Sequence, residues 1–147
     1  MGSSCLMIAS VAAAIKRRGY CLVLDCHSFP DKALPYELAA PDAARPDICI
    51  GTDEFHTSAA LSSAFVSEFE RAGWDVMVNN PSAGALVPSG RYRRDPRVHA
   101  VMVEVNRRLY LREPGAEPLP KFSLIARQIR QCCVTAIGAC SSWGESA

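Results

Sequence analysis

The feature that most constrains the fold of this chain is an uninterrupted apolar run of strand length, Tyr20-Cys-Leu-Val-Leu-Asp25. The segment before it, 4–18, is rich in Ala, Leu, Ile and Met and ends in three cations, which is typical of a helix; Gly19 then stops it. A strand without polar alternation is typical of a sheet that is covered on both faces. The order helix, glycine, buried strand therefore predicts an α/β fold with parallel strands.

The rest of the chain continues this alternation of helical and strand-length segments. Three further strands are expected, at 47–53, 74–79 and 99–106. Two further helices are expected, at 57–72 and 122–137. Thr57 or Ser58 can cap the first of these helices, and Gly73 can end it. Residues 28–46 contain four prolines and no periodicity, which is typical of a functional or mobile loop.

Composition fits one globular domain over residues 1–147. Hydrophobic residues make up 49% and charged residues 21% of the chain, enough for one compact core. Sixteen Lys and Arg against fifteen Asp and Glu give a net charge of +1, so there is no basic excess to displace counterions from nucleic acid or to bind an anionic membrane. We therefore expect neither partner, and the oligomeric state stays open.

The seven cysteines and the first helical segment bear on cellular location. The cysteine count is odd and no C-x-x-C pair occurs, which indicates reduced thiols in a cytoplasmic protein. The apolar segment 5–15 resembles the core of a signal peptide, but it runs into Lys16-Arg17-Arg18 where a cleavage site would lie. At about eleven residues it is too short to span a bilayer. A buried helix in a cytoplasmic protein is the expectation.

Asp25 and His27 are the first candidate functional residues, because ligands of open α/β sheets bind beyond the carboxyl ends of strands. Their i, i+2 spacing puts both side chains on one side of an extended strand. A neutral imidazole suits zinc, and a neighbouring carboxylate can be a second ligand, a hydrogen-bond partner or a base. The alternative is a capped strand end with a hydrogen-bonded histidine.

Glu104 is the second candidate, because it interrupts the apolar run 100–105. A carboxylate inside a buried strand costs free energy unless it is paired or bound to a metal. The two-residue period places it on one face with Ala100, Met102 and Asn106. These features suit a general base or acid, and a buried Glu–Arg pair is the alternative.

Other polar residues are candidates for binding a substrate. Asn79, Asn80 and Gly84 can supply hydrogen bonds after the third strand, or form only a turn. Arg107 and the arginines within 91–94 can hold an anion, although a solvated basic loop is the favoured interpretation of 91–94. No G-x-x-x-x-G-K, G-x-G-x-x-G, G-x-S-x-G or H-E-x-x-H pattern occurs, which argues against the commonest nucleotide-binding, serine-hydrolase and metalloprotease sites.

Several phrases, taken together and in order, resemble the N-formylglutamate amidohydrolases. They are Asp25-Cys-His-Ser-Phe-Pro30, Pro46-Asp-Ile-Cys-Ile-Gly-Thr-Asp53, Val78-Asn79 with Pro81 and Ala83-Gly84, and Val103-Glu-Val-Asn-Arg-Arg-Leu-Tyr110. The resemblance covers roughly residues 10–138. It implies an α/β fold similar to that of the zinc carboxypeptidases: a three-layer α/β/α sandwich with a mainly parallel mixed sheet, phosphorylase/hydrolase-like, incomplete at its amino terminus. It also implies hydrolysis of N-formyl-L-glutamate, or a related N-acyl amino acid, to formate and the amino acid.

The resemblance also implies roles for particular residues. His27 corresponds to a zinc ligand, with Asp25 as a possible second ligand, and Glu104 to the carboxylate that activates water and passes its proton to the leaving amine. Arg107 and the Asn79/Gly84 loop correspond to contacts for the substrate's carboxylates. Zinc lowers the pKa of bound water towards about 7 and polarises the formyl oxygen.

The chain departs from the family pattern in two places. The family has arginine and an aromatic residue where this chain has Asn80 and Ser82. Family members also have an earlier His-Ser-Gly segment with an acidic residue that completes the metal site, so we expect a truncated chain and an incomplete zinc site. Two alternatives therefore stay open: an inactive homologue or small-molecule binding module, and a peptidase similar to metallocarboxypeptidases.

Overall fold

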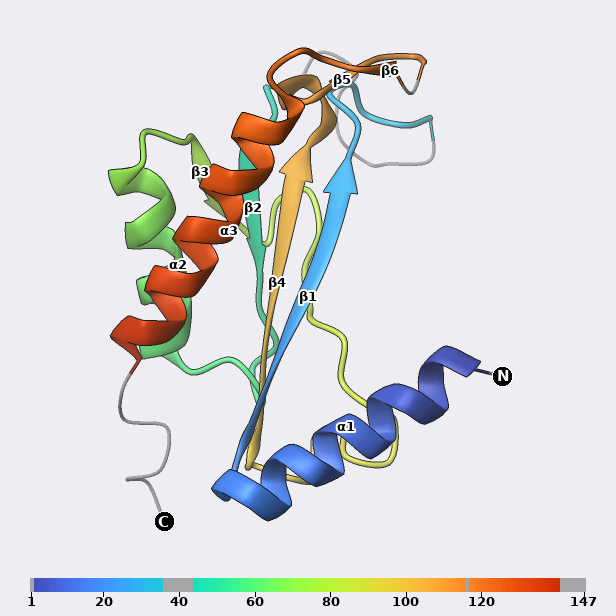
Figure 1. Ribbon diagram of the computed structural model, residues 1–147, viewed down its shortest axis with the longest axis vertical. Helices are drawn as coiled ribbons and strands as arrows, with labels where there is room; N and C mark the ends of the chain where they lie inside the picture. Colours follow the sequence, from blue (N-terminus) through green and yellow to red (C-terminus); the bar gives the residue numbers. More distant parts are fainter. Residues whose placement is uncertain (1, 36–43, 116, 141–147) are drawn as a thin grey trace.

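The computed structural model describes residues 2–35, 44–115 and 117–140. Its centre is a four-stranded sheet in the order β1-β4-β2-β3 (Figure 1). The strands are β1 (Cys21–Phe29), β2 (Ile48–Gly51), β3 (Val76–Val78) and β4 (Val98–Asn106). The β1–β4 and β2–β3 pairs are parallel and the β2–β4 pair is antiparallel. The predicted mixed, mainly parallel sheet is therefore confirmed.

The helices flank this sheet and give the molecule its layers. The three helices are α1 (Gly2–Arg18), α2 (Ala59–Arg71) and α3 (Phe122–Ala139). In Figure 1, α2 and α3 lie side by side over one face, whereas α1 crosses one end of the sheet. The predicted α/β class is confirmed, with one face of the sheet covered much less completely than the other.

The main core lies between the sheet and the α2–α3 pair. Alternate residues of β4, including Val101 and Val103, point into it, and α2 contributes Phe65 and Phe69, which have no exposed surface. These residues follow the periods of a strand and a helix, two and about 3.6 residues, so each element buries one side. The Ser58 side chain accepts a hydrogen bond from the Leu61 N–H at 3.2 Å, which caps α2 as predicted.

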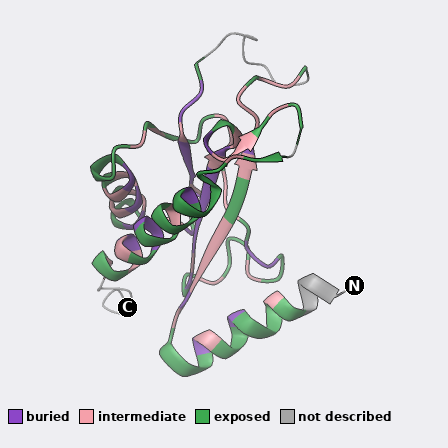
Figure 2. Ribbon diagram, turned by 45° about the horizontal axis from the view of Figure 1, so that its top comes forward, coloured by how far each residue is buried: buried purple, intermediate pink, exposed green. Residues whose placement is uncertain are grey.

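A second, smaller core lies on the opposite face beneath α1. Val11 and Ile15 of α1 pack against Cys21, Val98 and Ala100 at the beginnings of β1 and β4. Most of the described surface of α1 is exposed, as Figure 2 shows. The upper part of this second face therefore remains free of helices within the described residues.

Some predicted boundaries are wrong. Strand β1 continues to Phe29, so Asp25 and His27 lie inside the strand instead of at its end. The predicted loop 28–46 therefore begins later, and its residues 36–43 lie outside the described part of the chain. A 3₁₀ helix and the short antiparallel strands β5 and β6 were not predicted, and they occupy Arg107–Leu109, Leu111–Arg112 and Glu117–Pro118.

The cysteines whose side chains are described are all free. Cys21, Cys49, Cys132 and Cys133 are buried, whereas Cys26 is exposed. The predicted reduced thiols agree with this pattern. Within the described part of the chain, no helix combines the length and apolar character needed to cross a bilayer.

Candidate functional site

Strand register brings the principal candidate residues together on the face opposite α2 and α3. His27 of β1 is paired with Glu104 of β4, and Glu104 is paired with Cys49 of β2. Asp25, two residues before His27, is paired with Met102. Paired residues of neighbouring strands point to the same side of a sheet, so His27, Glu104 and Cys49 form one row across three strands, and Asp25 lies on the same face two residues before His27. These four residues are called the polar row below.

The Asp25 carboxylate orients the His27 ring. His27 Nε2 lies 2.7 Å from Asp25 Oδ1, and Asp25 Oδ2 accepts a hydrogen bond from the Leu86 N–H at 2.9 Å. The His27 side chain is about half exposed, and its Nδ1 has no partner among the described residues. An imidazole that donates from one nitrogen to a carboxylate presents a lone pair on the other, which is the arrangement used by metal-binding histidines.

Glu104 carries a buried oxygen without a partner. The residue is only 8% exposed, and its Oε2 is buried and makes no hydrogen bond. No arginine within the described residues forms an ion pair with it, so the alternative of a buried Glu–Arg pair finds no support there. Leaving a buried carboxylate oxygen unpaired costs about 1–3 kcal/mol or more. Such a group requires an explanation, such as a partner from outside the protein chain or a catalytic role.

Cys49 is a neighbour of Glu104 that the sequence analysis did not single out. Its thiol donates a hydrogen bond to the Ser82 carbonyl at 3.2 Å. Burial raises the pKa of the Cys49 thiol, the bond to Ser82 lowers it in part, and the Glu104 charge raises it again. Cys49 therefore stays protonated and is a poor nucleophile or metal ligand. The sequence held a signal for this position: the two-residue period of a strand places Cys49 on the face opposite the core residues Ile48 and Ile50.

The segment 84–86 crosses this face next to Asp25. The Gly84 N–H donates to the Thr52 carbonyl at 3.1 Å, and the Leu86 N–H reaches Asp25. Gly51 makes this crossing possible, because a Cβ there would lie 2.5 Å from the Gly84 carbonyl oxygen and 2.3 Å from the Met102 methyl. Gly84 itself has a φ of 95°, a conformation that favours glycine. The predicted candidate Gly84 thus borders the site through its backbone.

Asn79 lies after β3, and its side chain supports the turn. Its Oδ1 accepts from the Thr52 N–H at 2.8 Å, and its Nδ2 donates to the Thr52 hydroxyl at 2.8 Å. Strands β2 and β3 run opposite to β1 and β4, so the carboxyl end of β3 does not lie at the same edge as that of β1. Thr52 was not predicted as the partner of Asn79.

Arg107 begins the 3₁₀ helix directly after β4. Its Nε donates to the Ser28 hydroxyl at 3.2 Å, and its Nη1 lies 4.0 Å from the Glu113 carboxylate. The side chain is 40% exposed, so part of the guanidinium remains open to solvent. Arg107 therefore lies near the carboxyl end of β1, where it contacts Ser28, the residue after His27.

The metal-ligating residues near this face are too few for a complete catalytic zinc site. His27 and Asp25 supply two donors, and the described residues contain no group of three or more His, Cys, Asp or Glu side chains that could hold a metal ion. A catalytic zinc is usually held by three protein ligands. The described residues alone therefore do not fit such a site.

Together these features define an α/β protein with a mixed sheet and a polar row, including an unpaired buried carboxylate, on one face. The family model described as N-formylglutamate amidohydrolase matches residues 7–111, and the chain belongs to this family. Comparison with curated proteins gives no match.

A crystal structure at 2.00 Å resolution has a similar fold. It is the N-formylglutamate amidohydrolase from Ralstonia eutropha JMP134, with a TM-score of 0.75 and 22% sequence identity over 91% of this chain and 50% of that chain. The present chain thus spans about half the length of that relative. At this identity the likeness establishes the fold, and the predicted similarity to zinc carboxypeptidases stays a prediction.

Proposed function

We propose that this chain acts in hydrolysis of the formamide C–N bond of N-formyl-L-glutamate, or of a related N-acyl amino acid, releasing formate and the amino acid. Membership of the N-formylglutamate amidohydrolase family supports the reaction class. The observation that carries the proposal for this chain is the unpaired, buried Oε2 of Glu104 on the same sheet face as Asp25 and His27. A small N-acyl amino acid is the proposed partner.

Glu104 is proposed as the general base and acid. Its carboxylate takes a proton from a water molecule as the water oxygen bonds to the formyl carbon. The same proton then passes to the amine nitrogen and the C–N bond breaks, which leaves formic acid and the free amino acid. Formic acid then loses its proton to solvent and leaves as formate. A positioned carboxylate in this role contributes typically about 10²- to 10⁴-fold in rate. The buried position of Glu104 limits competing contacts with bulk water.

We propose zinc, or another divalent metal, as the cofactor, with His27 as a ligand and Asp25 as a second ligand or as the group that orients His27. The 2.7 Å bond between the two side chains supports the pairing. A three-ligand site would need at least one donor from outside the described residues.

Substrate contacts are proposed at the edge of the site. The exposed part of the Arg107 guanidinium suits a carboxylate of the substrate. The backbone at Gly84 borders the polar row, and Asn79 holds that turn through Thr52. In this proposal, Asn79 acts on the substrate through the shape of the turn, because its amide already has partners.

The proposal is tested by measuring formate released from N-formyl-L-glutamate with zinc added. We expect Glu104→Gln to lower turnover at least about 100-fold, because the amide cannot accept the proton. Glu70→Gln is the matched control, since Glu70 is an exposed carboxylate on α2 away from this face, and it should keep turnover unchanged. If the unaltered chain releases no more formate than Glu104→Gln and His27→Ala, the catalytic proposal is wrong.

A second candidate function is an inactive homologue that only binds a small molecule. The two-donor metal environment favours it. Zinc content distinguishes the two functions: one tightly bound zinc per chain, lost in His27→Ala, favours the enzyme. A chain that holds no zinc but binds N-formyl-L-glutamate favours the binding module.

A further inference from the structure

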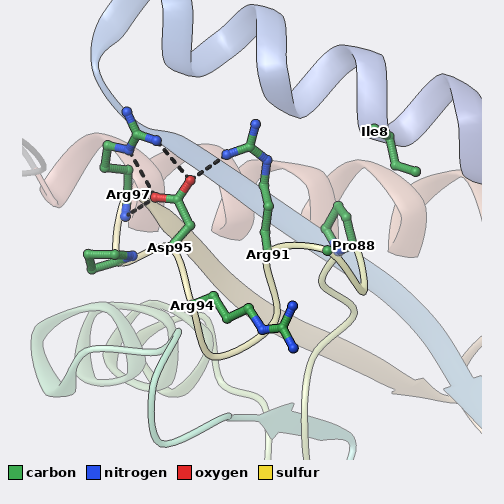
Figure 3. Close-up of a pocket in the computed structure, with 8 residues that line it drawn as sticks. Ile8, Pro88, Arg91, Arg94, Asp95 and Arg97 are labelled. Carbon is green, nitrogen blue, oxygen red and sulfur yellow. Dashed lines mark hydrogen bonds and ion pairs between the residues drawn. The ribbon is translucent and has the colours of Figure 1, made fainter.

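A concave site lies far from Glu104, between α1 and the loop that precedes β4. It is a hollow of about 660 Å³ bordered by Ile8 of α1, Pro88 and the arginines Arg91, Arg94 and Arg97 (Figure 3). Glu104 lies six residues along β4 from Val98, the first residue after this loop. At a strand rise of about 3.3 Å per residue, that separation is roughly 20 Å. The hollow is therefore a separate site from the polar row.

The side chains that line this hollow carry a net positive charge. One carboxylate, that of Asp95, holds two of the three arginines in place. Asp95 binds Arg97 through two oxygen contacts, Nε to Oδ1 at 2.9 Å and Nη2 to Oδ2 at 3.0 Å, and it also pairs with Arg91. Arg97 is the main reason that the pKa of Asp95 falls to about 2. Asp95 is therefore ionised at neutral pH, and three guanidinium groups against one carboxylate leave two positive charges uncompensated.

Arg94 supplies the least engaged of these charges. Its side chain is exposed and forms no hydrogen bond or ion pair with any other described residue. Arg91 uses Nη1 for Asp95 and retains its remaining N–H groups. Figure 3 shows Arg91 and Arg97 directed to Asp95, whereas the Arg94 side chain extends away from this group. Several N–H donors that line the hollow thus have no partner among the residues that the structure describes.

The loop that carries these arginines is fixed by a buried polar network. The Arg93 N–H donates to His56 Nε2 at 2.8 Å, and the other ring nitrogen of this buried histidine lies 2.6 Å from the Val98 carbonyl oxygen. Asp53 receives the Tyr92 hydroxyl at 3.0 Å and the Arg93 guanidinium at 3.3 Å. Arg93 has a φ of 52°, in the left-handed region. The network therefore holds the loop in a conformation that would otherwise be unfavourable.

The network also stays charged at neutral pH. Burial by itself would raise the pKa of Asp53, but hydrogen bonds from the Phe55 N–H, the Tyr92 hydroxyl, the His56 N–H and Arg93 together lower it. A fixed backbone reduces the conformational entropy that the arginines must lose when a ligand binds.

We propose that this hollow binds a small organic dianion, either a phosphate monoester or a dicarboxylate, with its charged end at Arg91, Arg94 and Arg97. A guanidinium fork matches phosphate and carboxylate oxygens alike, and two uncompensated charges match a dianion. Small-molecule sites typically enclose about 300–1,000 Å³, and the side chains of Ile8 and Pro88 offer an apolar surface to the body of the ligand. The arginines within 91–94, for which the sequence favoured a solvated basic loop, are thereby assigned to a binding site that is separate from the site of the proposed reaction.

The test uses three aromatic probes of similar size on the full chain at low salt. Phenyl phosphate represents a phosphate monoester, phthalate a dicarboxylate, and benzyl alcohol a neutral compound. Isothermal titration calorimetry should show at least one dianion binding at least tenfold more tightly than benzyl alcohol. If only phenyl phosphate binds, the ligand is a phosphate monoester, and if only phthalate binds, it is a dicarboxylate.

Two variants locate the binding. Arg94→Gln should weaken the bound dianion about tenfold, and because its side chain has no partner among the described residues, stability should not change. Arg127→Gln removes one exposed positive charge from α3 and should leave affinity unchanged. Equal affinities for the two variants, or no preference for either dianion over benzyl alcohol, overturn the proposal. Formate release is not measured in this test, so its outcome is independent of the proposed reaction.

Discussion

At the scale of single residues, the sequence identified candidate functional side chains, but it did not predict which residues contact them. His27 was predicted as a polar residue at a strand end and Glu104 as a carboxylate within an apolar run, and the strand register places the two side by side on one face. The partners of Asn79 and Cys49 were not predicted, because contacts with Thr52 and Ser82 depend on a turn whose path is set by tertiary packing. Their roles in a reaction stay proposals.

Asp95 gives a prediction about pH at this scale. Its pKa in the folded chain is lowered to about 2, chiefly by the hydrogen bond from Arg97, against an ordinary value of 3.8. The carboxylate therefore stabilises the fold above about pH 4, and this contribution is lost as the pH falls towards 2. We expect Asp95→Asn to lower the free energy of unfolding by about 1 kcal/mol at pH 7, because solvent screens a partly exposed pair.

Urea unfolding at pH 7 and at pH 2.5 measures this contribution. The difference between the unaltered chain and Asp95→Asn should be smaller at pH 2.5. Asp75→Asn removes an exposed carboxylate that forms no ion pair within the described residues and is the control. A difference that is constant with pH would show that Asp95 does not act through its charge.

At the scale of elements, helical periodicity was the most reliable signal. The prediction of a helix at 57–72 with a Ser58 cap agrees closely with α2, because Leu61, Phe65 and Phe69 recur at helical spacing and are all buried. Strand ends were less predictable. The carboxyl half of β1 contains the polar residues Asp25, His27 and Ser28, which resemble a loop, yet its backbone continues to pair with β4.

Phe65 provides a prediction about α2. We expect Phe65→Ala to lower the free energy of unfolding by about 3–5 kcal/mol, because the residue is fully buried and truncation leaves a cavity. Val134→Ala on α3 is the control, since Val134 is 53% exposed and should cost less than about 1 kcal/mol. Both values come from chemical denaturation, and equal losses in the two variants would contradict the assigned core.

At the scale of the whole molecule, the sequence predicted an α/β fold but not the order of its strands. The antiparallel β2–β4 pair reverses two of the four strands, and no local pattern in 48–51 distinguishes that direction from the other. The two-stranded β5–β6 unit was missed because its strands have only two residues each. Direction and order are properties of the assembled sheet.

The uneven covering of the sheet predicts uneven stability. Helix α1 is attached mainly through Val11 and Ile15, whereas β4 lies between two paired strands. We expect the amides of α1 to exchange with deuterium much faster than those of β4, because few buried contacts oppose local opening of this helix. Mass spectrometry of peptic fragments measures the rates, with α3 as a helical comparison. Equal protection of α1 and β4 would show that the chain opens only as one unit.

The position of β1 at the edge of the sheet has a mechanical consequence for His27. Among the described residues β1 pairs with β4 as its one neighbouring strand, so the backbone that carries His27 and Asp25 has one open edge. The relative position of His27 and Glu104 therefore depends on a single ladder of backbone hydrogen bonds between β1 and β4. A polypeptide strand that paired with the open edge of β1 would restrict the motion of the backbone that carries His27 without contacting its imidazole.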